Sequence, residues 1–196
     1  MEIVGPRAGV GDWLPFELVF VPDVTRVLGI DPGLTRCGYA VVDGRGANAE
    51  SAVAMGVIRT PPDQPLPQRL ATLGTELATL IAEFEPDVVA VEHVFFQVNV
   101  RTAMSVGQAS GLALAEAARA GCEVAQYTPN QVKDAVAGWG AASKAQVQQM
   151  VQTRLRLARP PQPADAADAA ALALCHLAMA PMRARIADAA RTRRPA

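Results

Sequence analysis

Short apolar runs bounded by turn residues mark out the part of the chain that follows residue 25. Residues 27–30, 37–42 and 49–58 each have the length of a strand and are rich in aliphatic side chains. The turn pair Asp43-Gly44 directly follows the second run, as is typical between antiparallel strands. We therefore expect these three runs to form an antiparallel meander.

The pattern then changes to helices alternating with buried strands. Residues 66–85 place apolar side chains at helical spacing, and residues 88–91 are a continuous apolar run typical of a central strand. This order predicts a crossover connection. Further elements are expected as helices at 102–120, 129–137, 143–157 and 164–180 and as a strand at 123–127. Three antiparallel strands followed by two in crossovers predict one α/β domain with a ribonuclease H-like fold, a five-stranded mixed sheet flanked by helices.

Both ends of the chain lie outside this pattern. Residues 1–24 are acidic, show no clear periodicity and contain several glycines and prolines, so we expect an extension that is disordered or not native. Residues 183–196 contain five arginines and one aspartate, which predicts a basic disordered tail. The folded domain is then expected to span residues 25–182.

Charge and cysteine content narrow the possible partners. The net charge is −1, but four acids and one arginine give residues 1–24 a charge of −3, which leaves residues 25–196 at +2 and permits a polyanionic substrate.

The three cysteines are widely spaced without a CxxC pair, which predicts reduced thiols and no zinc framework. Residues 169–182, the longest uncharged apolar run, are fewer than the roughly 18 to 20 residues that cross a bilayer, so we expect a cytoplasmic protein without a membrane partner.

Four carboxylates are expected at one end of the sheet. Asp31 directly follows the first strand and Glu92 the fourth, and side chains at the carboxyl ends of neighbouring strands meet. Asp165 and Asp168 lie three residues apart at the start of an alanine-rich helix, where they share a face. Capping and interaction with the helix dipole would explain these two acids. Alternatively, all four bind two Mg²⁺ ions about 4 Å apart, with Mn²⁺ as a substitute and Asp31 as the bridging ligand, for phosphodiester hydrolysis.

The segment Gly29-Ile-Asp-Pro-Gly33 also fits a second class of function. Nucleotide-binding domains of the actin and sugar-kinase type use a similar loop to handle phosphate. Such proteins normally contain the fold twice, and this chain has room for one copy. A third alternative is a ribonuclease H-like nuclease that acts on RNA.

Six motifs resemble, in order and spacing, the RuvC family of Holliday junction resolvases. They are Leu28-Gly-Ile-Asp-Pro-Gly33, Val91-Glu-His-Val-Phe95, Gly107-Gln-Ala-Ser-Gly111, Val132-Lys133, Ser143-Lys-Ala-Gln-Val147 and Asp165-Ala-Ala-Asp-Ala169. The resemblance covers about residues 26–180. It implies a homodimer that makes paired symmetric nicks in four-way DNA junctions during recombination and DNA repair, with RuvA and RuvB as partners. It also implies catalytic, metal-binding roles for Asp31, Glu92, Asp165 and Asp168.

The resemblance extends to residues that would contact DNA. It implies that Phe95 stacks on an unpaired base and that Lys133 and Lys144, the only lysines of the chain, lie near the DNA backbone. Solvated surface charge would explain the two lysines as well. His93 departs from the family pattern, since many relatives have glutamine beside the glutamate that corresponds to Glu92.

Three further residues are candidate phosphate contacts. Ser143 begins a capping-box pattern, so the amide groups of its helix can receive a phosphate, although capping alone explains the serine. Arg69 and Arg101 flank the predicted groove. His176 lies three helical turns beyond Asp165, too far along the helix to complete the same site, so we expect it to be buried.

The helix at residues 102–120 offers a surface for dimerisation. A junction has two symmetry-related strands to cut, which a twofold protein would match. Small residues on one helix face allow close packing either across such an axis or on the protein's own sheet. The face comprises Ala103, Val106, Gly107, Ser110, Ala113 and Ala117.

Overall fold

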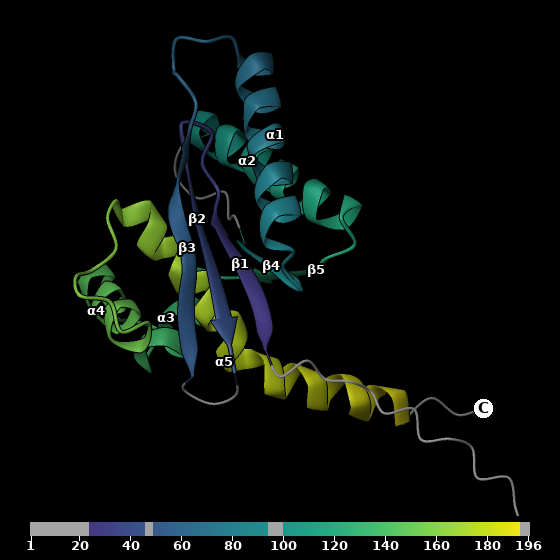
Figure 1. Ribbon diagram of the computed structural model, residues 1–196, viewed down its shortest axis with the longest axis vertical. Coiled ribbons are helices and arrows are strands. Elements are labelled where there is room, and N and C mark those ends of the chain that lie inside the picture. Colours follow the sequence, from purple (N-terminus) through teal and green to yellow (C-terminus); the bar gives the residue numbers. More distant parts are fainter. Residues whose placement is uncertain (1–23, 46–48, 94–99, 193–196) are drawn as a thin grey trace, which may run out of the picture.

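A computed structural model of the chain describes residues 24–45, 49–93 and 100–192 (Figure 1). Its centre is one sheet with the strand order β3-β2-β1-β4-β5. The first three strands pair in antiparallel fashion, and β4 and β5 are added in parallel. The mixed five-stranded sheet predicted from the sequence is therefore confirmed. The strands are β1 (Thr25–Asp31), β2 (Arg36–Gly44), β3 (Glu50–Arg59), β4 (Val88–Glu92) and β5 (Glu123–Tyr127).

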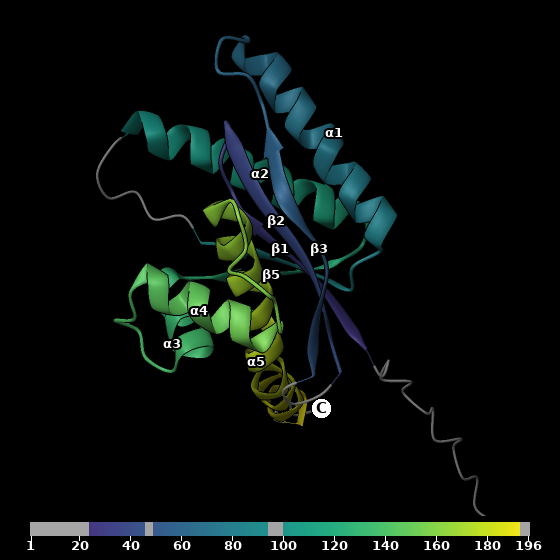
Figure 2. The same ribbon diagram turned by 60° about the vertical axis from the view of Figure 1, so that its left-hand side comes forward.

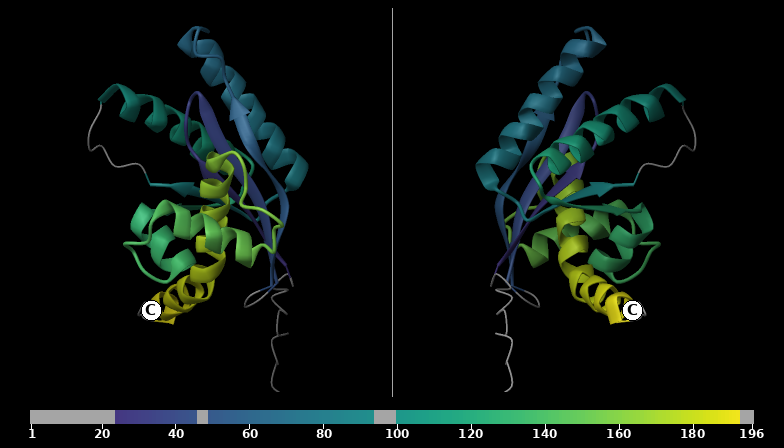
Figure 3. Two further views of the ribbon diagram at one scale, coloured as in Figure 1. Left: turned by 90° about the vertical axis from the view of Figure 1, so that its left-hand side faces the viewer. Right: turned by 90° about the vertical axis from the view of Figure 1, so that its right-hand side faces the viewer.

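Helices cover both faces of the sheet, as Figures 2 and 3 show. One core packs α1 and α2 against side chains such as Leu28, and the other packs α3, α4 and α5 against side chains such as Val27. Alternate residues of a strand point to opposite faces, so a central strand that is apolar throughout can supply both cores. The helices are α1 (Leu66–Phe84), α2 (Val100–Arg119), α3 (Pro129–Ala137), α4 (Lys144–Arg154) and α5 (Ala164–Thr192).

Two glycines allow α5 to approach the sheet closely. A Cβ atom at Gly29 of β1 would lie 2.0 Å from the carbonyl oxygen of Ala169. A Cβ atom at Gly38 of β2 would lie 2.1 Å from the carbonyl oxygen of Asp165. Both distances are shorter than any side chain tolerates, so only glycine fits at these positions. The first turns of α5 are thereby held against β1 and the start of β2, at the end of the sheet where Asp31 lies.

The helix α5 is longer than the sequence predicted. We expected it to end at Ala180 and a disordered tail to begin at Arg183, but the helix continues to Thr192 with Pro181 inside it. Alanine, arginine and methionine are strong helix formers, and one proline removes a single backbone hydrogen bond. The backbone of 183–192 is therefore helical, which corrects the prediction of a tail that is disordered from residue 183.

The cysteines agree with the prediction of reduced thiols. All three are free, with Cys37 and Cys175 buried and Cys122 partly buried. Burial raises the pKa of both Cys37 and Cys175 to about 12, so their thiols stay protonated at neutral pH. In the described ranges, none of the helices combines the length and hydropathy that crossing a bilayer requires.

Candidate active site

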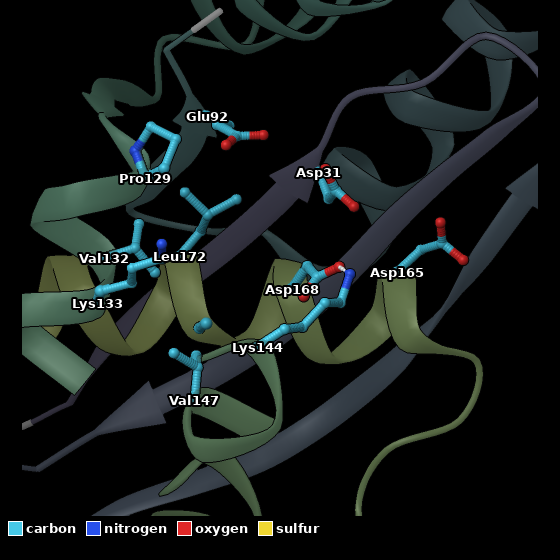
Figure 4. Close-up of a pocket in the computed structure, with 11 residues that line it drawn as sticks. Asp31, Glu92, Pro129, Val132, Lys133, Lys144, Val147, Asp165, Asp168 and Leu172 are labelled. Carbon is cyan, nitrogen blue, oxygen red and sulfur yellow. Dashed lines mark hydrogen bonds and ion pairs between the residues drawn. The ribbon is translucent and has the colours of Figure 1, made fainter. Parts of the chain in front are cut away.

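The four predicted carboxylates line one pocket of about 440 Å³ (Figure 4). Asp31 is the last residue of β1 and Glu92 the last of β4, and these strands are parallel neighbours with Ile30 opposite Val91. Asp165 and Asp168 enter from the first turns of α5, which crosses the same end of the sheet. Residues far apart in the sequence thus meet because parallel strands end together and a helix packs closely over that end.

Negative charge in the pocket is only partly balanced. Burial, followed by the nearby carboxylates of Asp168, Glu92 and Asp165, raises the pKa of Asp31 to about 7. Burial, followed by Asp168, also raises the pKa of Glu92. A raised pKa means that the folded protein resists ionisation of these two acids. The pocket therefore favours the arrival of positive charge.

The two acids of α5 each pair with a basic side chain. Arg36 donates from Nε to Oδ2 of Asp165 at 3.0 Å and from Nη2 to the same oxygen, and these bonds are the main cause of the lowered pKa of Asp165. Lys144 donates from Nζ to Asp168. Within the described ranges, no three histidine, cysteine, aspartate or glutamate side chains lie close enough together to hold one metal ion. The four acids share a pocket, but Asp165 is paired with Arg36 and Asp168 with Lys144.

The donor set nevertheless fits Mg²⁺. Hard divalent cations prefer carboxylate oxygens, and all four acids supply them. After burial, the largest influence on the pKa values of Asp31 and Glu92 is the carboxylate of Asp168, which outweighs the opposing charge of Lys144. Arg36 and Lys144 are both partly exposed, so water can take the place of either cation beside its carboxylate.

The raised pKa of Asp31 predicts a pH-dependent stability in the absence of divalent ions. In the unfolded chain this carboxyl ionises near its ordinary pKa of 3.8, whereas in the fold it keeps its proton to about pH 7. Between these values the folded state binds more protons, so raising the pH from about 4 to about 7 should lower the free energy of unfolding by about 2–4 kcal/mol.

Urea unfolding in EDTA at several pH values measures this effect. The Asp31→Asn variant should lose this part of the pH dependence, and Mg²⁺ should reduce it in the wild type because a bound cation stabilises the ionised carboxylate. Identical pH profiles for wild type and variant in EDTA would contradict the burial of charge at Asp31.

The residues predicted to contact DNA differ in their positions relative to the acidic pocket. Lys133 and Lys144 both line the acidic pocket. Ser143 forms the predicted capping box, in which its Oγ accepts from Gln146 N at 3.3 Å and its own N–H donates to Gln146 Oε1 at 2.8 Å. Arg69 donates to the hydroxyl groups of Thr60 and Thr35. Phe95 and the side chain of Arg101 lie outside the described residues, so both stay predictions.

Two histidines near these elements have structural contacts. His176 is buried as predicted, and its Nδ1 lies 2.9 Å from the hydroxyl oxygen of Tyr127. The backbone N–H of His93 donates to the carbonyl oxygen of Tyr127 at 2.8 Å, which continues the pairing of β4 with β5 beyond Glu92. This bond fixes the backbone directly after the candidate glutamate.

Arg36 is the residue of the pocket region that sequence reasoning missed. It begins β2 and reaches an acid 129 positions further along the chain. The only available signal was that Arg36 lies five residues after Asp31, on the strand paired with β1. That signal does not show which acid the arginine contacts, since the contact depends on how α5 packs across the sheet.

The chain is similar in sequence to proteins of one family. The family model of "Crossover junction endodeoxyribonuclease RuvC" matches residues 27–176. A protein of that name from Salinispora arenicola is 56% identical over 165 residues, which cover 84% of this chain and 94% of the relative. Another of that name, from Rhodococcus jostii, is 52% identical over 84% of this chain and 87% of its own.

Solved structures show the same fold. The structure of Thermus thermophilus RuvC in complex with Holliday junction substrate matches with a TM-score of 0.78 and 39% identity, over 81% of this chain and 96% of that chain. The yeast mitochondrial Holliday junction resolvase Ydc2 shares the fold with a TM-score of 0.60 at 16% identity, over 79% of this chain and 78% of its own. From the family match and these identities, the chain belongs to the RuvC family of crossover junction endodeoxyribonucleases.

Proposed function

We propose that this protein resolves Holliday junctions by cutting two symmetry-related DNA strands, in recombination and DNA repair in the cytoplasm. The observation that carries the proposal is the pocket in which Asp31, Glu92, Asp165 and Asp168 meet, in a chain of the RuvC family. The related RuvC of Thermus thermophilus is described with a Holliday junction as its substrate, which supports the same substrate here.

The four carboxylates are proposed to hold two Mg²⁺ ions, for which Mn²⁺ can substitute. When bound, the ions supply an activated water and a counter-charge for the leaving oxygen. Asp31 and Glu92 offer their oxygens from rigid strand ends, and Asp165 and Asp168 offer theirs from α5. Without the ions, the high pKa of Asp31 keeps part of this set protonated near neutral pH.

The lysines of the pocket are proposed to hold the DNA strand. Lys133 and Lys144 line its wall together with the apolar side chains of Val132, Val147 and Leu172. Ammonium groups attract the phosphates on either side of the scissile bond, while the apolar wall limits competing water. Phe95, Arg101, Ser143 and Arg69 are proposed as further DNA contacts. Ser143 and Arg69 also form hydrogen bonds within the protein.

A homodimer is proposed because two cuts must be made in a symmetric substrate. The small face of α2 is divided between two environments. Ser110, Ala113 and Ala117 are buried against the protein's own core, whereas an added Cβ atom at Gly107 would meet no other part of the described structure within 4 Å. The glycine side of α2 is therefore the proposed surface for the second copy. RuvA and RuvB are proposed as further partners from family membership.

The test is incubation of the protein with a synthetic mobile four-way junction, with a linear DNA duplex of the same sequence and with the corresponding RNA duplex. With Mg²⁺ we expect paired nicks at symmetric positions in the junction and an intact duplex. EDTA should abolish the nicks. Cleavage that persists in EDTA, or equal cleavage of the duplex or of an RNA duplex, would contradict the proposal and favour a nuclease of a different substrate class.

A further inference from the structure

Arg36 binds the carboxylate of Asp165 at the edge of the acidic pocket. Two of its N–H groups donate to the same oxygen, Oδ2, one of them from Nε at 3.0 Å. The side chain of Arg36 is 38% exposed and that of Asp165 is 27% exposed, so water reaches the pair. In the view of Figure 4, Asp31 lies between Glu92 and Asp165, and Asp165 points away from Lys144.

This contact competes directly with a metal ion. An oxygen that accepts two N–H groups has both of its lone-pair directions in use. A guanidinium is always charged at neutral pH, and its positive charge also repels a divalent cation a few ångströms away. Asp165 therefore cannot keep both donors of Arg36 and offer Oδ2 to an ion in the pocket.

We propose that Arg36 is a resident counterion of Asp165 that a divalent metal ion displaces from Oδ2, so that Arg36 opposes filling of the metal site at Asp165 as Lys144 does at Asp168. This inference rests on the proposed function, in which Asp165 is a ligand. Within the described residues, the acids of the pocket that form an ion pair are Asp165 and Asp168, and neither strand-end acid does so. Arg36 thus sets how readily the site fills, without touching the DNA bond that is cut.

Binding of Mn²⁺ measured by electron paramagnetic resonance tests the proposal without any cleavage. The Arg36→Gln variant keeps a long polar side chain but removes the charge, and we expect it to bind Mn²⁺ about three- to tenfold more tightly than the wild type. The Arg36→Lys variant keeps the charge but loses the paired donors, and its affinity should lie between the two.

The matched control is Arg59→Gln. Arg59 is the cross-strand neighbour of Arg36 on β3 and is exposed, and within the described ranges the ion pair of Asp165 is with Arg36. Removing this second charge should change Mn²⁺ affinity by less than about twofold, as expected for a solvated charge without direct contact. Thermal unfolding of each variant checks that the fold is kept.

The Asp165→Asn variant separates this inference from the proposed function. If that variant binds Mn²⁺ more weakly than the wild type and Arg36→Gln binds more tightly, both stand. Weaker binding by Asp165→Asn with unchanged or weaker binding by Arg36→Gln would overturn the role of Arg36 alone. Unchanged binding by Asp165→Asn would overturn the proposed ligand set and this inference with it.

Discussion

Replacing Asp31 by asparagine is expected to lower the rate of junction cleavage by about a thousandfold or more while junction binding is kept or tightened. Asparagine has nearly the same shape, so β1 and its pairing with β2 and β4 should be unaffected. The change removes one carboxylate from the centre of the pocket, where Asp168, Glu92 and Asp165 all act on it. It therefore removes a proposed metal ligand and a negative charge that faces the DNA phosphates.

Two measurements check this expectation. Cleavage is followed on a labelled four-way junction with Mg²⁺, and binding is followed by gel shift of the same junction in EDTA. Asp63→Asn serves as the matched control, because Asp63 is exposed and lies outside the pocket, and it should leave both quantities unchanged. Parallel loss of cleavage, binding and thermal stability in Asp31→Asn would show that the residue supports the fold rather than the chemistry.

Replacing Gly29 by alanine should destabilise the protein by at least about 3 kcal/mol. The added methyl group would lie 2.0 Å from the carbonyl oxygen of Ala169 and 3.0 Å from the backbone nitrogen of Ala173. Both atoms belong to the backbone of α5, so no flexible side chain can move aside, and the whole helix would have to shift. For a domain of this size we expect a fall in Tm of roughly 6–12 °C.

The control for this prediction is Gly74→Ala. A Cβ placed at Gly74 of α1 would lie 3.7 Å from a side-chain atom of Leu112 and 3.8 Å from one of Glu116, which is ordinary van der Waals contact. Alanine is the better helix former, so this variant should gain about 0.5–1 kcal/mol. Urea unfolding of both variants gives the comparison. Equal stability of Gly29→Ala and the wild type would mean that α5 does not pack as closely on β1 as described.

The sequence was sufficient to predict the strands of the sheet and the positions of Asp31 and Glu92 at strand ends. The strands follow from local apolar runs, and the positions of the two acids follow from the rule that parallel neighbouring strands end at the same edge. Apolar runs of strand length indicated all five strands, and parallel neighbours end together, which placed Asp31 beside Glu92. The spacing of Asp165 and Asp168 indicated a shared helix face. Whether that face met the strand ends could not be predicted from periodicity, since it depends on how α5 packs.

Features that depend on long-range packing were not predicted. The pair of Arg36 with Asp165 joins the start of β2 to the start of α5, and no local pattern links them. The role of Gly29 was also hidden, since a glycine beside a strand-end acid equally fits a phosphate-binding loop. The helical continuation of α5 past Pro181 was missed because charge composition was given more weight than helix propensity.

The glycine contacts beneath α5 have a consequence for redesign of the pocket. At Gly29 and Gly38 the backbone of α5 lies against the backbone of the sheet, so the helix cannot move closer. A larger residue at either position would push the helix away from the sheet. The distance between the backbone of the strand ends and the backbone of α5, which carry the two pairs of acids, is thus fixed by these glycines. Efforts to accommodate a larger or smaller ion should accordingly vary side-chain length at the acids themselves and leave these two backbone positions untouched.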